Sequence, residues 1–436
     1  MSSVPIAYRL AVTAARAAAP VLARSDSKLG RGMAGRRDAH EVLQSWAEER
    51  RVPERPLAWF HAPSVGEGLQ AQAVMRALKD VVPELQTAYT YFSPSAESLG
   101  ERFGADVAGY LPWDQGSLVG SVLDALRPSV LVFTKTEVWP VLVEEARARR
   151  IPVVLVAATV PSDAGRLKWP ARTVMRGTWR ALSAGLACSE ADAERLAELG
   201  MSPDRIEVTG DPGIDSAAER AGGADPDAPY LAPFFADPRL TVVAGSTWPA
   251  DEEVLIPALS ALRDHVPGLR VILAPHEPGE DRVGALLGSF IERGWHPSTL
   301  AHIEEDGVVG DVNAIVVERV GVLAQLYTAA TVAFVGGGFH DAGLHSVLEP
   351  AAAGVPIVFG PRHANARAAS DLAASGGAVV VSDASEAAHA LLEWLTGGEK
   401  REYAGGRARG YIEGHLGAAD RTARALASLM SPSEYR

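Results

Sequence analysis

Two glutamates follow predicted strands in the first half of the chain, where an acid could take a proton from a substrate. Glu67 lies in HAPSVGEG after the apolar run 56–63, and Glu137 lies in TKTEVWP after the run 129–135. A carboxylate held close to a hydroxyl can act as a general base. Ser64 and Glu67 also have the spacing of a capping box, in which two side chains close the start of a helix. The spacing alone leaves both interpretations of Glu67 open.

Small and glycine-rich stretches follow predicted strands in the second half. Ser246 and Thr247 lie in AGSTWP, where small side chains allow the backbone to approach a ligand closely. Gly337 is the second of three glycines in FVGGGFHDAGLHSVLEP, and glycines at a strand end let backbone N–H groups face an anion. These stretches predict a site for an anionic ligand.

The same run continues with three polar residues, His345, Ser346 and Glu349, which we expect to open a helix. A glutamate in such a first turn could bind the hydroxyls of a ribose. Alternatively, His345 and Glu349 are four residues apart and could form a hydrogen-bonded pair on one helix face. Ser93 and Ser95 after the run 86–94 leave a similar choice between binding an anionic group and capping the next helix.

Metal and redox chemistry are not indicated. The single cysteine, Cys188, excludes a disulfide framework and a cysteine-built zinc site, as expected in a reducing cytoplasm. The eleven histidines form no HExxH motif, and no P-loop or GxSxG motif is present. We therefore predict neither a metal nor a cofactor. The net charge of −13 argues against nucleic acid as a partner.

The charge is unevenly distributed along the chain. Seven basic residues against one acidic residue give residues 1–37 a net charge of +6, so the remainder carries −19. The segment is too short and too charged for a comfortable transmembrane span. Its sequence fits two interpretations equally well. It could be an interfacial helix on an anionic membrane or an alanine-rich helix packed on the protein's own first domain.

Alternating apolar runs and helical patterns predict an α/β fold with two Rossmann-like, doubly wound domains that face a cleft. The first domain spans 38–217 and the second 239–398, joined by a Gly-, Pro- and Asp-rich linker at 218–238. We expect residues 399–436 to be a C-terminal helical segment. The predicted strands are 56–63, 86–94, 107–112, 129–135, 151–160, 185–189 and 205–210, then 240–247, 269–275, 314–321, 331–338, 356–361 and 377–383.

Taken in order, the motifs resemble those of the 3-deoxy-D-manno-octulosonic acid (Kdo) transferases of lipopolysaccharide synthesis, which are GT-B glycosyltransferases. The resemblance rests on WFHAPSVGEG, the SPSAES turn, TEVWP, VTGDPGID, VVAGSTWPADEE, ILAPHEPGE and GGGFHDAGLHSVLEPAAAGVPIVFGPRHANA. It covers roughly residues 25–385. This chain has Ser346 where many members have asparagine, and APHEP where many have PRHPE.

The resemblance implies an inverting, metal-independent transfer of Kdo from CMP-Kdo to a lipid A precursor. It makes Glu67 the general base, with Glu137 supporting it, and assigns Ser246, Thr247, His276, His345, Ser346 and Glu349 to the donor. Gly337 of the glycine run is expected at the same donor site. It also implies that residues 1–37 hold the enzyme peripherally or monotopically on the cytoplasmic face of the inner membrane, an anionic surface.

The acceptor that the resemblance implies is anionic, so we expect basic groups near it on an otherwise acidic protein. Arg166 and Lys168 are the candidates for its phosphates, together with Ser93 and Ser95. A solvated helix face explains the basic run Arg166, Lys168, Arg172, Arg176 and Arg180 as well. An isomerase of the UDP-N-acetylglucosamine 2-epimerase type is the main alternative, since it shares the two-domain fold. Another GT-B nucleotide-sugar transferase or a non-catalytic nucleotide-sugar-binding protein, in which Glu67 is only a cap, also fits.

Overall fold

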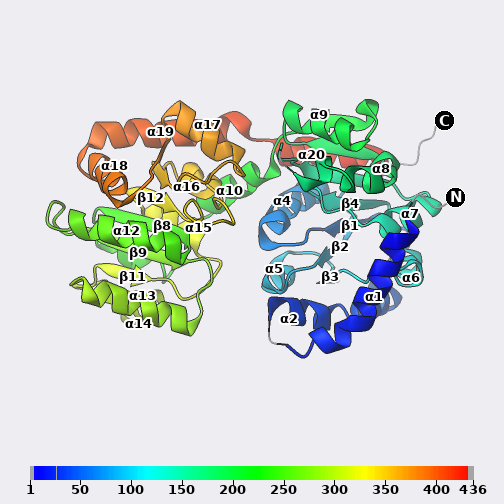
Figure 1. Ribbon diagram of the computed structural model, residues 1–436, viewed down its shortest axis with the longest axis horizontal. Helices are drawn as coiled ribbons and strands as arrows, with labels where there is room; N and C mark the ends of the chain where they lie inside the picture. Colours follow the sequence, from blue (N-terminus) through cyan, green and yellow to red (C-terminus); the bar gives the residue numbers. More distant parts are fainter. Residues whose placement is uncertain (1–3, 26, 163, 431–436) are drawn as a thin grey trace. The chain divides into compact units, whose positions relative to one another are not determined.

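The computed structural model describes residues 4–25, 27–162 and 164–430, and Figure 1 shows the course of the chain. Its internal contacts form two compact units. Unit 1 contains Met1–Ser216 and Gly417–Arg436, and unit 2 contains Ala217–Leu416. The C-terminal segment predicted at 399–436 is therefore shared between the units. The ends of the chain at 1–3 and 431–436 lie outside the described residues.

Unit 1 is built on a seven-stranded sheet with the order β3-β2-β1-β4-β5-β6-β7, in which every strand pair is parallel. Its strands are β1 Leu57–His61, β2 Gln86–Tyr91, β3 Val107–Tyr110, β4 Val130–Thr134, β5 Val153–Ala158, β6 Ala184–Ala187 and β7 Ile206–Val208. Its helices are α1 Ile6–Leu22, α2 Lys28–Gly35, α3 Ala39–Arg50, α4 Val65–Val81, α5 Glu97–Arg102, α6 Gly116–Leu126, α7 Pro140–Ala148, α8 Ala171–Ala181, α9 Glu190–Leu199 and α20 Ala418–Met430, with short 3₁₀ turns η1 Pro94–Ala96, η2 Gly165–Leu167 and η3 Pro203–Arg205.

Unit 2 has a second parallel sheet with the order β10-β11-β9-β8-β12-β13-β14. Its strands are β8 Thr241–Thr247, β9 Arg270–Pro275, β10 Pro297–Thr299, β11 Ala314–Val316, β12 Val332–Val335, β13 Ile357–Phe359 and β14 Ala378–Val380. Its helices are α11 Ala232–Ala236, α12 Pro249–Leu262, α13 Glu280–Glu292, α14 Leu300–Asp306, α15 Leu323–Leu326, α16 Leu348–Ala352, α17 Arg367–Ser375, α18 Ala384–Thr396 and α19 Gly398–His415, with η4 Tyr327–Ala329; α10 Pro212–Gly222 runs from unit 1 into unit 2.

The central strands are apolar along their whole length because both faces of each sheet are covered. Alternate residues of β1 show this directly: Leu57 and Trp59 belong to one buried cluster, while Ala58 and Phe60 belong to another. In unit 2, Val242 and Val243 divide between two clusters in the same way. The prediction of two doubly wound α/β sheets is confirmed.

The predicted linker at 218–238 is largely folded onto unit 2. Its first residues complete α10, and α11 buries Phe234 beside Leu231 in a cluster that includes strand residues of the second sheet. The segment lacks a clear helical period because its apolar residues are few and separated by glycine and proline. Its composition indicated a linker, yet Phe234 is buried, whereas the neighbouring Phe235 is exposed.

The C-terminal helices pack on different units. Helix α19 contacts α16, α17 and α18, whereas α20 lies along α4, with Ala419, Ala423 and Leu426 in the unit 1 core (Figure 1). The carboxylate of Asp215 accepts the backbone N–H groups of Gly417 and Ala419 at 2.6 and 2.9 Å, which fixes the start of α20. The last helix of the chain thus completes the core of unit 1.

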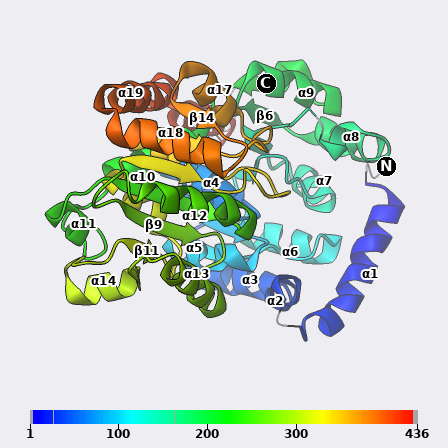
Figure 2. The same cartoon turned by 60° about the vertical axis from the view of Figure 1, so that its left-hand side comes forward.

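Helix α1 packs on unit 1 through a few polar contacts. The Tyr8 hydroxyl donates to Asp114 at 2.8 Å, Arg9 pairs with Glu144, and Arg16 donates to Gln115. Figure 2 shows α1 along the side of this unit. Most of its apolar side chains remain exposed, among them Ile6 and Leu10 at 76% and 65%. No helix in the described part of the chain is long and apolar enough to span a membrane.

Candidate active site

Glu67 lies in the first turn of α4, directly after β1. The predicted capping box is not formed, because the N-cap residue Ser64 makes no side-chain cap hydrogen bond. Instead, Glu67 Oε1 lies 3.3 Å from Lys135 Nζ. The other oxygen, Oε2, is buried and has no hydrogen-bond partner. The structure therefore leaves one carboxylate oxygen of Glu67 without a structural task.

Glu137 lies on the loop between β4 and α7, which we call the Glu137 loop (residues 135–139). Burial raises the pKa of Glu137, the charge of Arg166 opposes this, and the nearby charge of Glu67 adds to it. The two predicted acids are thus electrostatic neighbours in unit 1. Arg166 reaches the loop from η2 and lies 3.5 Å from Glu137 Oε2.

His61, at the end of β1, contacts both Trp139 of the Glu137 loop and Thr90 of β2. It is a neutral imidazole. Its side chain is fully buried, and burial lowers the pKa of His61 to about 3. Its Nε2 accepts the indole N–H of Trp139 at 3.3 Å, so Nδ1 carries the proton and faces the Thr90 carbonyl oxygen at 3.0 Å. His61 is a fixed part of the framework and not a proton carrier at neutral pH.

The predicted acceptor residues differ in how far contacts within the protein already use their polar groups. Ser93 caps η1 by accepting the N–H of Ser95, and the two hydroxyls lie 2.8 Å apart. This contact does not decide whether the two serines also bind the acceptor. Arg166 donates to the Thr136 carbonyl oxygen at 2.6 Å and so braces the Glu137 loop. Lys168 is exposed at the end of η2.

Four aromatic rings gather in unit 2 where β8, β9 and β12 end. Trp248 stacks on His340 with ring centroids 4.2 Å apart and on His276 at 4.6 Å, and His276 stacks on His345 at 4.4 Å. The Trp248 indole donates to His345 Nε2 at 2.9 Å. Burial, followed by the charges of His276 and His340, lowers the pKa of His345 to about 4. His345 is therefore a neutral hydrogen-bond acceptor at neutral pH.

Ser246 and Thr247 precede this cluster on β8. Ser246 has a φ of +56°, a left-handed conformation that costs a non-glycine residue energy. The Thr247 hydroxyl donates to Glu252 Oε1 at 2.8 Å, and Glu252 pairs with Arg282 through its other oxygen. The Thr247 hydroxyl proton is therefore held by Glu252, and only 2% of the residue is exposed.

The glycine run does not offer its amides as we expected. Gly337 N–H donates to Asp251 Oδ2 at 2.7 Å, and Phe339 N–H donates to Asp251 Oδ1 at 3.0 Å. Asp251, in the first turn of α12, thus takes the place of the predicted anion. Gly337 itself requires glycine, because its φ is +93° and an added Cβ would lie 2.2 Å from the Gly343 carbonyl oxygen.

The prediction that His345, Ser346 and Glu349 open a helix is wrong about where that helix begins. Helix α16 begins at Leu348, so His345 and Ser346 lie in the preceding loop, where the positive-φ residue Gly343 interrupts regular structure. The pair between His345 and Glu349 is not formed. Glu349 instead accepts from Arg220 of α10 at 2.6 Å, with 16% of its side chain exposed.

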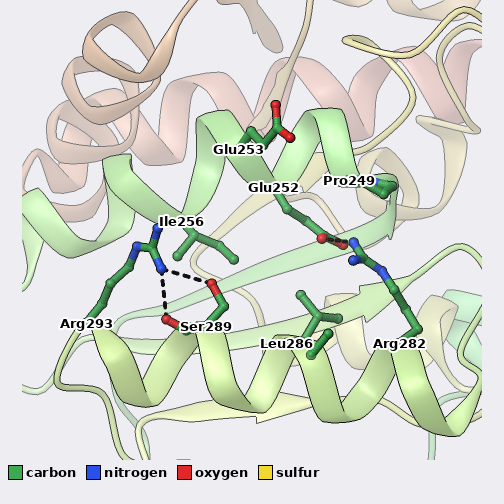
Figure 3. A pocket seen from close by; sticks show the side chains of 9 residues that line it. Pro249, Glu252, Glu253, Ile256, Arg282, Leu286, Ser289 and Arg293 are labelled. Carbon is green, nitrogen blue, oxygen red and sulfur yellow. Dashed lines mark hydrogen bonds and ion pairs between the residues drawn. The ribbon is translucent and has the colours of Figure 1, made fainter.

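A hollow of about 180 Å³ lies between α12 and α13, beside the Thr247–Glu252–Arg282 chain. Figure 3 shows Glu252 reaching Arg282 across it, while Arg293 turns to Ser289. None of the predicted site residues lines this hollow. Among the described residues, no group of three or more His, Cys, Asp or Glu side chains could hold a metal ion.

Comparison with known proteins identifies the relatives of the chain. Residues 38–216 match the family model described as 3-deoxy-D-manno-octulosonic-acid transferase (kdotransferase). The 3-deoxy-D-manno-octulosonic acid transferase of Bordetella pertussis is 29% identical over 394 residues, which cover 85% of this chain and 87% of that protein. The transferase of the same name from Chlamydophila psittaci is 29% identical over 70% of each chain. The chain is a relative of the Kdo transferases.

The likeness to solved structures is one of fold. A putative UDP-N-acetylglucosamine 2-epimerase from Listeria monocytogenes matches with a TM-score of 0.61 at 12% identity, covering 86% of this chain and 96% of that one. A glycosyltransferase from Rickettsia africae matches with a TM-score of 0.58 at 10% identity, covering 86% and 98%. This Kdo transferase relative therefore has a GT-B-like, two-domain α/β fold, as predicted.

Sequence reasoning missed several partners of the predicted residues. Asp251 and Glu252 follow β8 as Glu67 follows β1, so the signal that singled out Glu67 was present there too. Lys135 stands beside Glu137 in the same motif. Arg220 gave no signal, because 129 residues separate it from Glu349 and only the fold brings them together.

Proposed function

We propose that this Kdo transferase relative moves Kdo from CMP-Kdo to a hydroxyl of a lipid A precursor, with Glu67 as the general base. One observation carries the assignment of the base. Glu67 sits at the start of α4, forms no cap, and keeps one oxygen free of any hydrogen bond while Lys135 holds the other. A carboxylate in that condition is ready to accept a proton from an incoming hydroxyl.

The proposed transfer is a displacement at the anomeric carbon of Kdo. The acceptor oxygen forms a bond to the anomeric carbon of Kdo, its proton passes to Glu67, and the bond from that carbon to the phosphate oxygen of CMP breaks. Attack from the side opposite CMP inverts the anomeric centre. Positioned proton transfer of this kind contributes roughly 10²- to 10⁴-fold to a rate. Glu137 and Arg166 support the site, and Lys168 together with Ser93 and Ser95 is proposed to meet the anionic acceptor.

Donor binding is assigned to the end of β8 and the loops after β9 and β12 in unit 2. Thr247 is proposed to support this region from within, since its hydroxyl proton is held by Glu252 and the residue is buried. His276 and His345 form a flat stack with Trp248, a surface on which a pyrimidine ring can lie. Glu349 is proposed to accept from the ribose, with Arg220 fixing its carboxylate, and Ser246, Gly337 and Ser346 shape the same region.

Attachment to the cytoplasmic face of the inner membrane is proposed for residues 1–37. Exposed apolar residues on α1, such as Ile6 and Leu10, and the net charge of +6 suit an anionic lipid surface. Arg24, Arg31 and Arg37 are exposed in this segment.

The test is incubation of the purified protein with CMP-Kdo and a tetraacylated lipid A precursor, followed by mass spectrometry of the lipid. We expect a mass increase of one or more Kdo units that persists in EDTA, since no ligand cluster for a divalent ion is present among the described residues. In a thermal-shift assay, CMP should stabilise the protein more than UDP does. Stabilisation by UDP alone, with no lipid product, would instead favour an epimerase.

A further inference from the structure

Arg36 is a buried cation between α2 and α3. Only 3% of the residue is exposed. Its Nε and Nη2 atoms donate to the carbonyl oxygens of Leu111 and Pro112, each at 3.0 Å. Isolated charges are costly to bury, so a buried guanidinium needs such partners.

Three aromatic rings surround this guanidinium. Its carbon lies 4.5 Å from the ring centroid of Trp113, 4.9 Å from Phe92 and 5.0 Å from Trp139. Cation–π attraction is strongest for arginine over tryptophan and in places without water. Arg36 therefore joins the segment after β2, the segment after β3 and the Glu137 loop, whose last residue is Trp139.

A second contact runs from the N-terminal segment to the same loop. Asp114 accepts the N–H groups of Val141 and Leu142 at 3.0 and 2.7 Å, which holds the start of α7 immediately after the Glu137 loop. The same carboxylate accepts the hydroxyl of Tyr8 from α1 at 2.8 Å. Both ends of residues 4–36 are thus connected to the framework of the candidate active site.

We propose that Arg36 is a positioning residue for Kdo transfer, which holds Trp139 and the Glu137 loop in place, so that the N-terminal segment completes the acceptor-side site as well as providing attachment. The inference rests on the proposed function for its kinetic part. The N-terminal segment, which we proposed to attach the enzyme to the membrane, then also positions residues of unit 1.

The charge of Arg36 also acts on Glu137. Burial lowers the pKa of Arg36 to about 10, so it remains a cation at neutral pH. Burial raises the pKa of Glu137; Arg166 from η2 opposes this, Glu67 from α4 reinforces it, and Arg36 opposes it. Burial and the charge of Asp114 raise the pKa of the Tyr8 hydroxyl on α1, and the charge of Glu137 adds to this. Removing the Arg36 cation therefore moves the pKa of Glu137 further upward.

Three variants of the full chain test the proposal. Arg36→Met removes the charge and the hydrogen bonds, Arg36→Lys keeps the charge but loses the planar fork, and Arg50→Met is the matched control at an exposed position on α3. We expect kcat of Arg36→Met to fall roughly 10- to 100-fold with an unchanged KM for CMP-Kdo, because small misplacements of a site cost about that much. The acidic limb of its kcat–pH profile should move to higher pH, while that of Arg36→Lys stays near wild type.

Hydrogen–deuterium exchange of the peptide 134–142 gives a readout without activity. We expect faster exchange there in Arg36→Met than in wild type, and no change in Arg50→Met. Wild-type kinetics and pH profile in Arg36→Met would overturn the proposal, as would an equal loss at every pH in both Arg36 variants, because that pattern indicates a structural role alone. If wild type itself transfers no Kdo, the proposed function fails, and unchanged exchange in Arg36→Met would then overturn the positioning role separately.

Discussion

Replacing Glu67 by glutamine tests the proposed base with the least disturbance of the structure. The two side chains have nearly the same size, but the amide cannot accept a proton. The carboxylate has one partner, Lys135, and one unpaired oxygen. We expect Glu67→Gln to lose nearly all transfer while it keeps its fold and its affinity for CMP, since the proposed donor residues belong to unit 2.

The effects of this change on stability and on the transfer rate can be estimated separately. The Lys135 side chain is 40% exposed, so its pair with Glu67 contributes only about 0.2–1 kcal/mol to stability. For a unit of this size, that corresponds to a shift in Tm of a few degrees at most. Loss of a general base should lower kcat roughly 10²- to 10⁴-fold, which is about 2.7–5.5 kcal/mol of barrier. Activity should therefore fall far more than stability.

The assay compares kcat, Tm and CMP affinity of Glu67→Gln with those of Glu41→Gln. Glu41 is an exposed first-turn acid of α3, so it controls for the interaction of a carboxylate with a helix start. A Glu67→Gln enzyme that turns over near the wild-type rate, or a loss of similar size in Glu41→Gln, would refute the assignment. An unfolded Glu67→Gln protein would show that the side chain is structural.

Three further predictions concern the donor and the membrane. Glu349→Ala should raise the KM for the donor by about 10- to 150-fold with kcat nearly unchanged, and calorimetric titration with CMP checks this; wild-type affinity would remove Glu349 from the site. Deleting residues 1–37 should shift the protein from the membrane to the soluble fraction without abolishing CMP binding, and high salt should partly mimic this; a truncated chain that sediments with membranes would place the attachment elsewhere. Because burial lowers the pKa of His345 from 6.5 to about 4, its contribution to stability is complete above pH 6.5 and is lost as the pH falls towards 4. Thermal unfolding between these values should show the loss, and it should be smaller in His345→Gln.

The sheets were predictable because buried parallel strands are continuous apolar runs. Val153–Ala158 and Thr241–Thr247 both fall inside runs that the sequence marks clearly. The exception is β10, Pro297–Thr299, which has three half-buried residues without an aliphatic side chain. It pairs only with β11 at the edge of its sheet, so neither length nor hydrophobicity distinguished it from a loop.

Site residues were predictable where their place after a strand determines where they lie. They were not predictable where only the fold brings distant residues together. Glu67 and Glu137 follow strands β1 and β4, which are adjacent in the sheet, so their proximity follows from the topology. The capping spacing of Ser64 and Glu67 misled, because Lys135 from another strand end competes for the carboxylate. Likewise, Asp251 takes the amides of the glycine run from 86 residues away.

The N-terminal segment packs on unit 1, and its attachment to a membrane stays a prediction. Its exposed apolar residues Ile6 and Leu10 face away from the protein and suit a lipid surface. Tyr8, on the same helix, is tied to Asp114, and the buried Arg36 at the far end of the segment stacks on Trp139. A helix can present one side to the membrane and another to the domain, because residues three or four apart share a face and intervening ones do not. If attachment holds α1 in one position, the contacts from Tyr8 and Arg36 transmit that restraint to the Glu137 loop. Deletion of residues 1–37 should therefore lower kcat even with a detergent-dispersed acceptor, whereas loss of attachment alone would leave that rate unchanged.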